Sequence, residues 1–289
     1  MNQSRKIKTI IEPQYVMEGA GVKLRRSISP NASNLFDPFL LFDHFAFNDP
    51  IEGPIRGFPM HPHRGIETVT YILEGTVNHR DSLGNSGTIG PGDVQWMTSG
   101  RGILHEEMPR RGPSGVIYGF QLWVNLPAAL KMSPPRYQGV NVGVIPNLEQ
   151  NGGKIRIVAG EINGVQGPVT QISANPIYID VTLAPSAEFV QEIPFGHTAL
   201  AYVFDGNGIF GEKRSYTHAE EISAVKLVHF GDGDHIRAEA SPDSPFRFML
   251  MAGAPFREPI VPYGPFVMNT VEEIQQALMD LRNGTFVQQ

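Results

Sequence analysis

Short apolar runs separated by turn residues recur along the whole chain. The run from residue 66 to 73, Ile-Glu-Thr-Val-Thr-Tyr-Ile-Leu, is rich in β-branched and aromatic residues and ends at Glu74-Gly75. Comparable runs cover residues 94–97, 103–108 and 116–124. Glycine (31) and proline (24) are frequent between the runs, and Gly90-Pro91-Gly92-Asp93 fits a type II turn. Short strands punctuated by turns are typical of an all-β sandwich or barrel.

The end of the chain carries a different periodicity, which predicts one α-helix. Thr270 and Glu273 fit a capping box, and Gly284 is placed to end the helix. Apolar residues follow at helical spacing: Val271, Ile274, Leu278 and Leu281. We expect this helix to cover one end of a barrel or the neighbouring domain. A short helical turn is expected at 128–130.

The second half of the chain repeats the pattern of the first. Residues 201–206, Ala-Tyr-Val-Phe-Asp-Gly, echo residues 70–75, Thr-Tyr-Ile-Leu-Glu-Gly, and Gly231-Asp232-Gly233-Asp234 echoes the turn at 90–93. Such echoes predict a duplicated barrel, although turn dipeptides also recur by chance. Prolines cluster between 125 and 140, so we predict two tandem antiparallel β-barrels, 1–133 and 134–289, the second ending in the helix.

Composition narrows the class of protein. The 289 residues are 41% apolar and 18% charged, with a formal net charge of −6 and a pI near 5.8, so direct nucleic-acid binding is disfavoured. There are no cysteines, which excludes disulfides and thiolate metal sites. The N-terminus lacks the features of a secretory signal, and no apolar run is long enough to cross a bilayer. We expect a cytoplasmic protein without membrane contact, and a monomer.

Two pairs of side chains carry the candidate chemistry. His61 and His63 are two residues apart in an extended stretch, so both imidazoles point to one side. His105 and Glu107 repeat this geometry on a later strand. If the first stretch stays extended, Val69, Tyr71 and Leu73 point to the same face as the histidines. A bulge at Gly65 would instead turn these residues to the opposite face. After residue 150 no such pair recurs, so the second barrel is expected to lack a metal.

Three imidazoles and a carboxylate without sulfur suit a divalent ion of Fe, Mn, Co, Ni, Cu or Zn. Four protein ligands leave up to two octahedral positions for water, O2 or a bidentate substrate, whereas a structural zinc is closed at four ligands. The less specific interpretation is that His61 and His63 are hydrogen-bonded turn histidines and Glu107 a surface carboxylate. Glu67, four residues after His63, is an alternative ligand, and spacing alone does not choose between the two glutamates.

The stretch from 58 to 109 resembles the signature of the pirins, bicupin members of the cupin superfamily. The resemblance rests on Phe-Pro-Met-His-Pro-His-Arg-Gly-Ile-Glu-Thr-Val-Thr-Tyr at its start and Pro-Gly-Asp-Val-Gln-Trp-Met-Thr-Ser-Gly-Arg-Gly-Ile-Leu-His-Glu-Glu-Met-Pro at its end. It extends to Pro-Tyr-Gly-Pro-Phe-Val-Met-Asn-Thr near the C-terminus. Pirins hold iron through positions matching His61, His63, His105 and Glu107, so the resemblance favours Glu107 over Glu67 as the fourth ligand. Glu67 is then expected to lie in the core or to hydrogen-bond to a ligand.

The resemblance implies two different functions. Some pirins are quercetin 2,3-dioxygenases, which open a flavonol with O2 and release carbon monoxide. On this hypothesis Fe(II) is the metal, and Glu107 takes the proton of the flavonol 3-hydroxyl. Others are redox-sensing regulators that bind a transcription factor or a metabolic enzyme. Met60, Trp96, Met97 and Phe120 are candidates to hold a planar substrate, although each is also typical of a barrel core; Arg64 and Arg101 would orient an anionic substrate or simply aid solubility.

Overall fold

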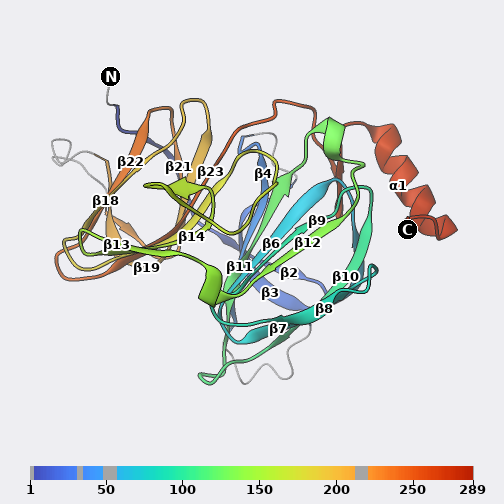
Figure 1. Ribbon diagram of the computed structural model, residues 1–289, viewed down its shortest axis with the longest axis horizontal. Coiled ribbons are helices and arrows are strands. Elements are labelled where there is room, and N and C mark those ends of the chain that lie inside the picture. Colours follow the sequence, from blue (N-terminus) through green and yellow to red (C-terminus); the bar gives the residue numbers. More distant parts are fainter. Residues whose placement is uncertain (1–2, 31–34, 48–56, 212–220, 289) are drawn as a thin grey trace. The chain divides into compact units, whose positions relative to one another are not determined.

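The computed structural model describes residues 3–30, 35–47, 57–211 and 221–288, which fold into two compact units (Figure 1). Unit 1 consists of Met1–Pro13 and Gly143–Pro255, and unit 2 of Gln14–Val142 and Phe256–Gln289. Antiparallel strands make up most of both units. The described residues contain one α-helix, α1 (Val271–Asn283), and the expected turn at Ala128–Leu130 is a 3-10 helix. The all-β class with a C-terminal helix is confirmed.

The units exchange their terminal segments, which differs from the expected division at residue 133. Strand β1 (Ile7–Ile11) pairs with β21 (Lys226–Phe230) of unit 1. At the other end, a bridge joins Phe266 of β25 (Phe266–Met268) to Arg64 in unit 2. The local hydrophobic pattern marks where a strand lies but not which distant strand it pairs with. Sequence periodicity therefore could not assign the two ends of the chain.

Unit 2 contains two main sheets. The larger has the order β12 (Arg136–Val140), β9 (Val94–Thr98), β6 (Ile66–Glu74), β11 (Ile117–Asn125), β4 (Phe39–Phe47), β3 (Val22–Ile28), β2 (Gln14–Glu18). The smaller has the order β5 (Phe58–His63), β10 (Ile103–Arg110), β7 (Thr76–Asp81), β8 (Ser86–Ile89). Strand β24 (Val261–Tyr263) pairs with β25. Side chains of β6 and β11 hydrogen-bond to β10, so the two main sheets face each other. They are open, cupin-like sheets and not closed barrels.

Unit 1 repeats the order of the main strands, although its long strand β19 (Thr198–Phe210) takes the place of both β6 and β7. Its main path has the order β1, β21, β19, β23 (Phe246–Gly253), β17 (Ile177–Leu183), β14 (Gly153–Ala159), β13 (Asn147–Gln150). Off this path lie β18 (Glu188–Glu192), β20 (Ile222–Ser223) and β22 (His235–Ala240), and a separate pair is β15 (Glu161–Ile162) with β16 (Val165–Gln166). Pairing of β18 with β22 corresponds to pairing of β5 with β10. The predicted duplication is therefore visible in the topology.

One of the two sequence echoes is in register and the other is not. Residues 70–75 lie at the end of β6 and residues 201–206 lie in β19, its topological counterpart. The turn at 90–93 precedes β9, whereas Gly231–Asp234 lies between β21 and β22, where unit 2 has the turn after β9. Glycine-aspartate turns suit many hairpin ends. The second echo is therefore a recurrence of turn chemistry and not a duplicated position.

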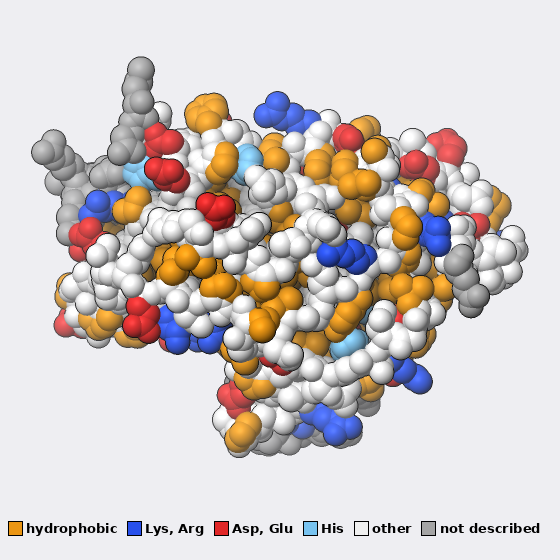
Figure 2. Space-filling view, viewed as in Figure 1, with side chains coloured by type: hydrophobic (Ala, Val, Ile, Leu, Met, Phe, Trp, Pro, Cys, Tyr) orange, Lys and Arg blue, Asp and Glu red, His pale blue; other side chains and the backbone are white. Residues whose placement is uncertain are grey.

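Helix α1 is formed as the sequence predicts. The Thr270 hydroxyl accepts a hydrogen bond from the Glu273 amide, the Glu273 carboxylate accepts one in return, and Gly284 ends the helix at φ 72°. Ile274 and Ala277 form its buried face. No helix in the described ranges is long and apolar enough to cross a membrane. On the face shown in Figure 2, acidic and basic side chains are interspersed, as the modest net charge suggests.

Candidate metal centre

Strands β5 and β10 bring the predicted histidines together. His61 and His63 project from the same side of β5, and His105 lies directly across the antiparallel register from His61. One ring nitrogen from each of the three histidines lies within 4.8 Å of the other two. His63 and His105 are buried, and His61 is half-buried. Elsewhere in the described ranges, no other group of three His, Asp or Glu side chains places its ligand atoms this close.

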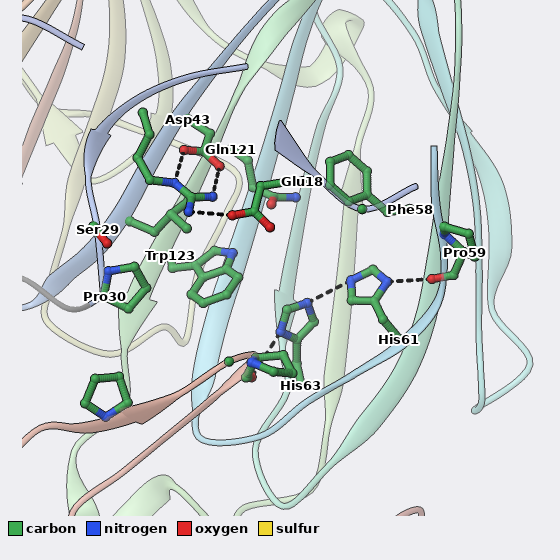
Figure 3. A pocket seen from close by; sticks show the side chains of 16 residues that line it. Glu18, Ser29, Pro30, Asp43, Phe58, Pro59, His61, His63, Gln121 and Trp123 are labelled. Atoms are coloured by element: carbon green, nitrogen blue, oxygen red, sulfur yellow. Dashed lines mark hydrogen bonds and ion pairs between the residues drawn. The ribbon is translucent and has the colours of Figure 1, made fainter. Parts of the chain in front are cut away.

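Backbone carbonyls fix the tautomers of two of these histidines. Nδ1 of His61 lies 2.9 Å from the carbonyl oxygen of Pro59, and Nδ1 of His63 lies 3.3 Å from that of Pro265 (Figure 3). Because a carbonyl oxygen only accepts, each Nδ1 carries the proton and donates it. Each Nε2 is then left with its lone pair. The C-terminal segment thus contributes directly to the geometry of the centre.

The two free lone pairs lie close to each other, an arrangement that suits a cation between them. Nε2 of His61 lies 3.1 Å from Nε2 of His63. Two acceptors at hydrogen-bond distance repel each other unless a proton or a metal ion lies between them. Both ring nitrogens of His105 are buried without a hydrogen-bond partner among the described residues, and such groups are uncommon in native interiors. These residues therefore fit a metal ion.

Burial keeps the His63 and His105 imidazoles in the neutral form that binds metal. Burial lowers the pKa of His63 well below its ordinary value, and the neighbouring His105 and His61 lower it further. Burial likewise lowers the pKa of His105, with His61 and His79 adding to the effect. Neutral histidine is the ligand form, so no proton has to leave these two side chains at neutral pH before a metal binds.

Glu107 lies on the same strand as His105 but has its own hydrogen-bond partners. The Thr70 hydroxyl donates to Oε1 at 2.9 Å, and the Gln121 amide donates to Oε2 at 2.9 Å. Glu107 is 4% exposed, and the register of β10 against β5 shifts between His105 and Glu107. The carboxylate is not part of the three-histidine group. It is held between β10 and the larger sheet.

Glu67, the alternative ligand, is buried on β6 away from this group. Its Oε1 accepts a hydrogen bond from the Thr98 hydroxyl at 2.8 Å. Burial raises its pKa to about 7. The sequence contained no signal for that value, because the spacing from His63 suggested only that the side chain points inward.

A cavity of about 390 Å³ borders the histidines, all of it within unit 2 (Figure 3). Its lining residues are Glu18, Gly19, Arg26, Ser29, Pro30, Leu41, Asp43, Phe58, Pro59, His61, His63, Gln121, Trp123, Pro262, Gly264 and Pro265. The size lies in the range typical of small-molecule sites. Aromatic rings flank the histidines: the Trp123 ring centroid is 5.2 Å from that of His63, and the Phe58 centroid is 6.3 Å from that of His61.

None of the four predicted substrate-holding residues lines this cavity. Trp96, Met97 and Phe120 are buried in the core of unit 2, and Met60 is 44% exposed. On β11 the cavity face carries Gln121 and Trp123, whereas Phe120 and Leu122 face the core. The sequence signal for Trp123 was the alternation along this strand, but alternation alone does not say which face looks into a cavity.

The two arginines considered for substrate binding contact the C-terminal segment instead. Arg64 is 1% exposed, donates to the Asp280 carboxylate at 2.7 Å and packs 4.5 Å from the centre of the Phe286 ring. Arg101 donates to the Gln288 carbonyl at 3.1 Å. Neither lines the cavity. Arg64 is thus neither a substrate ligand in this geometry nor an exposed solubilising residue, because it is buried in an ion pair with α1.

Comparison with known proteins agrees with this architecture. The pirin family pattern matches residues 21–124, and that of the pirin C-terminal cupin domain matches residues 178–287. Human pirin is 41% identical over 285 residues, covering 98% of this chain and 94% of that protein. Pirin-like protein 2 of Arabidopsis thaliana is 44% identical over 272 residues, covering 92% and 81%. The crystal structure of a quercetin 2,3-dioxygenase from Acinetobacter baumannii superposes with a TM-score of 0.86 at 33% identity, covering 98% and 99%.

Proposed function

The chain belongs to the pirin family, and we propose that it is an iron-dependent oxygenase that opens a flavonol such as quercetin with O2 and releases carbon monoxide. The observation that carries this proposal is the cluster of His61, His63 and His105 beside an aromatic-lined cavity. Similarity to the Acinetobacter quercetin 2,3-dioxygenase over nearly the whole chain supports it. A cytoplasmic location and a monomeric state stay predictions.

In this proposal the metal ligands are His61, His63, His105 and Glu107. Fe(II) is the metal that we favour, with Mn, Ni, Co, Cu or Zn as alternatives for the same donor set. When bound, the ion supplies Lewis-acid charge and a path for electrons. The protein contributes the preset tautomers of His61 and His63, whose Nδ1 protons are held by the Pro59 and Pro265 carbonyls. Such fixed partners orient ligands before any ion arrives.

Glu107 is the group that we propose accepts the proton of the flavonol 3-hydroxyl. Its two oxygens accept hydrogen bonds from Thr70 and Gln121, which hold the carboxylate in one orientation. Gln121 also lines the cavity, so it connects the cavity wall to the carboxylate. Proton transfer to a side chain that is held in position typically accelerates a reaction by about 10²- to 10⁴-fold.

Phe58 and Trp123 take the role that the sequence suggested for other aromatic residues. Both line the cavity next to the histidines, and a planar ligand there has ring faces and edges to pack against. Met60, Trp96, Met97 and Phe120 lie outside this lining. The planar substrate is therefore proposed to pack against Phe58 and Trp123.

The test is turnover of quercetin by protein that is loaded with Fe(II) under argon and then mixed with O2. We expect loss of the flavonol absorbance together with release of carbon monoxide. Glu107→Ala should lower kcat by about 10²-fold or more if Glu107 is the base. A matched control is Glu192→Ala, an exposed carboxylate of unit 1. Unchanged turnover in Glu107→Ala would contradict the proposed roles of Glu107 as base and as ligand, but not the oxygenase activity itself.

Absence of turnover with every flavonol tested would favour the second function that the resemblance implies. In that case the site is a redox-sensing metal centre, and oxidation of the ion adds one positive charge that a partner protein reads. The similarity to human pirin is compatible with this second function. Binding only zinc, with a melting temperature that depends strongly on the metal and no catalysis, would instead indicate a structural site.

A further inference from the structure

A charged cluster faces the histidines from the other side of the cavity. The Arg26 guanidinium donates from Nε to Asp43 Oδ1 at 2.8 Å, from Nη2 to Asp43 Oδ2 at 2.7 Å, and from Nη1 to Glu18 Oε1 at 2.7 Å. All three residues line the cavity. Figure 3 shows Glu18 and Asp43 across the pocket from His61 and His63. The two ends of one cavity thus carry different chemistry.

The charges of this cluster do not cancel. Two carboxylates face one guanidinium, which leaves a net charge of −1 when both are ionised. Each Arg26 nitrogen already donates to a carboxylate, and Asp43 uses both of its oxygens on Arg26. Glu18 binds Arg26 through Oε1, so Oε2 is the acceptor that a ligand can reach. The carboxamide nitrogen of Gln121 donates to Glu107, which leaves its carbonyl oxygen as a second acceptor.

One donor at this wall has no partner. The indole nitrogen of Trp123 is buried and makes no hydrogen bond within the described residues, and the side chain is only 9% exposed. Figure 3 shows the ring of Trp123 beneath Glu18 in the same pocket. Buried donors without acceptors are uncommon, so this wall combines strong acceptors with one unsatisfied donor. A hydroxyl group, which both donates and accepts, complements that combination better than a carboxylate or an aliphatic group.

We infer that Glu18, with Gln121 and Trp123, selects ligands that carry phenolic hydroxyls on the ring remote from their metal-chelating group. The inference rests on the proposed function, because it assumes that the chelating group lies at the histidines. A hydroxyl at the far end donates to the Glu18 carboxylate, whereas an anionic group there is repelled by the net negative charge of the cluster. Glu18 is thus a specificity-determining residue of this site.

The experiment measures binding without turnover. Fe(II)-loaded protein is titrated under argon with quercetin, which has two hydroxyls on its remote ring, and with galangin, which shares every other hydroxyl and the carbonyl but has none on that ring. The wild type should bind quercetin more tightly. A hydrogen bond to a charged group contributes enough that Glu18→Gln should weaken quercetin binding by about tenfold, and galangin binding by less than about twofold. Glu188→Gln, which breaks a similar pair with Arg237 in unit 1, should change neither.

The outcomes separate this inference from the proposed function. Selective loss of quercetin affinity in Glu18→Gln supports the inference. Equal binding of both flavonols by the wild type, or an equal loss for both in Glu18→Gln, overturns it while leaving the flavonol site in place. Failure of the wild type to bind either flavonol overturns both. Near-ultraviolet circular dichroism and a metal content equal to the wild type confirm that the variant is folded and loaded.

Discussion

The two units have the same strand order but opposite interiors. In unit 1 the facing sheets enclose a continuous apolar cluster that includes Phe189, Phe210, Phe246 and Phe248. In unit 2 the corresponding space holds His63, His105 and Glu107 with their partners, next to a cavity. The difference is clearest on matching strands: β18 and β22 contribute Phe189, Ile236 and Ala238 to the apolar cluster, where β5 and β10 contribute histidines. The same architecture therefore serves as a packed core or as a site, depending on a few inward positions.

The strongest way to test this contrast is to remove a histidine from unit 2. His105→Ala deletes an imidazole whose two ring nitrogens have no described partner, so metal binding should be lost while the fold persists. Metal content after loading and desalting, by mass spectrometry, measures this. His197→Ala removes a partly exposed imidazole from unit 1 and should leave the metal content unchanged. Equal metal content in both variants would contradict the proposed centre.

The converse change is made in the apolar interior. Phe248 is fully buried and contacts the rings of Phe189, Phe210 and Phe246. Phe248→Ala should destabilise unit 1 by about 3–5 kcal/mol through lost burial and the cavity left behind. Urea unfolding, followed by fluorescence and circular dichroism so that two transitions are resolved, measures the change. At urea concentrations below the first transition, the metal content of Phe248→Ala should equal that of the wild type. A lower metal content would show that metal binding in unit 2 depends on the packing of unit 1.

A buried carboxyl makes the polar interior of unit 2 sensitive to pH. Burial raises the folded-state pKa of Glu67 to about 7, above an unfolded value of about 4.3. Its stabilising contribution is present below the unfolded pKa and is lost as pH rises through the folded one. As the pH rises from 4.5 to about 8, the free energy of unfolding of Glu67→Gln should therefore increase relative to that of the wild type by on the order of 2–3 kcal/mol.

Urea unfolding of both proteins at several pH values measures this difference. Phe248→Ala is the control, because it changes no ionisable group and its deficit should not vary with pH in the same way. A constant difference between the wild type and Glu67→Gln would contradict the raised pKa.

The smallest expected effect concerns the support that α1 gives to the histidines. Asp280 pairs with the buried Arg64, which follows His63 in the sequence. Asp280→Asn removes the charge that holds Arg64 and loosens the segment carrying Pro265, so metal affinity should fall by about tenfold, as for other residues that orient ligands. Competition with a chromophoric chelator measures it. Glu272→Gln, exposed on the same helix, is the control. Equal metal affinity in both variants would show that α1 does not support the histidines.

Much of this molecule was predictable because local chemistry determined it. The strands at 66–74, 94–98 and 103–110 and the capped helix follow from short-range periodicity and turn residues. The grouping of His61, His63 and His105 follows from i, i+2 spacing and strand pairing. What spacing could not supply was the identity of long-range partners, such as the exchange of terminal segments between the units.

Other features depend on contacts that leave no local trace. The strand through His63 does not continue into residue 66, since the chain turns at Gly65 with φ 81°. A Cβ there would lie 2.1 Å from the Val267 carbonyl oxygen, so glycine is required by a residue about two hundred positions away. The ion pair of Arg64 with Asp280 and the contact of the Pro265 carbonyl with His63 also join residues that are far apart in the sequence. Their sequence signal was only an ordinary arginine and an ordinary proline.

The contact between His63 and Pro265 sets an order of events in the cell. A ribosome makes all three histidines long before it makes Pro265, and the first-made part of a chain generally begins to fold before synthesis ends. Until the last segment leaves the ribosome, Nδ1 of His63 lacks the carbonyl that fixes its proton. The nascent protein therefore has every proposed ligand but lacks the contact that orients one of them. We expect the proposed centre to present preset ligands to its ion only once the chain is complete.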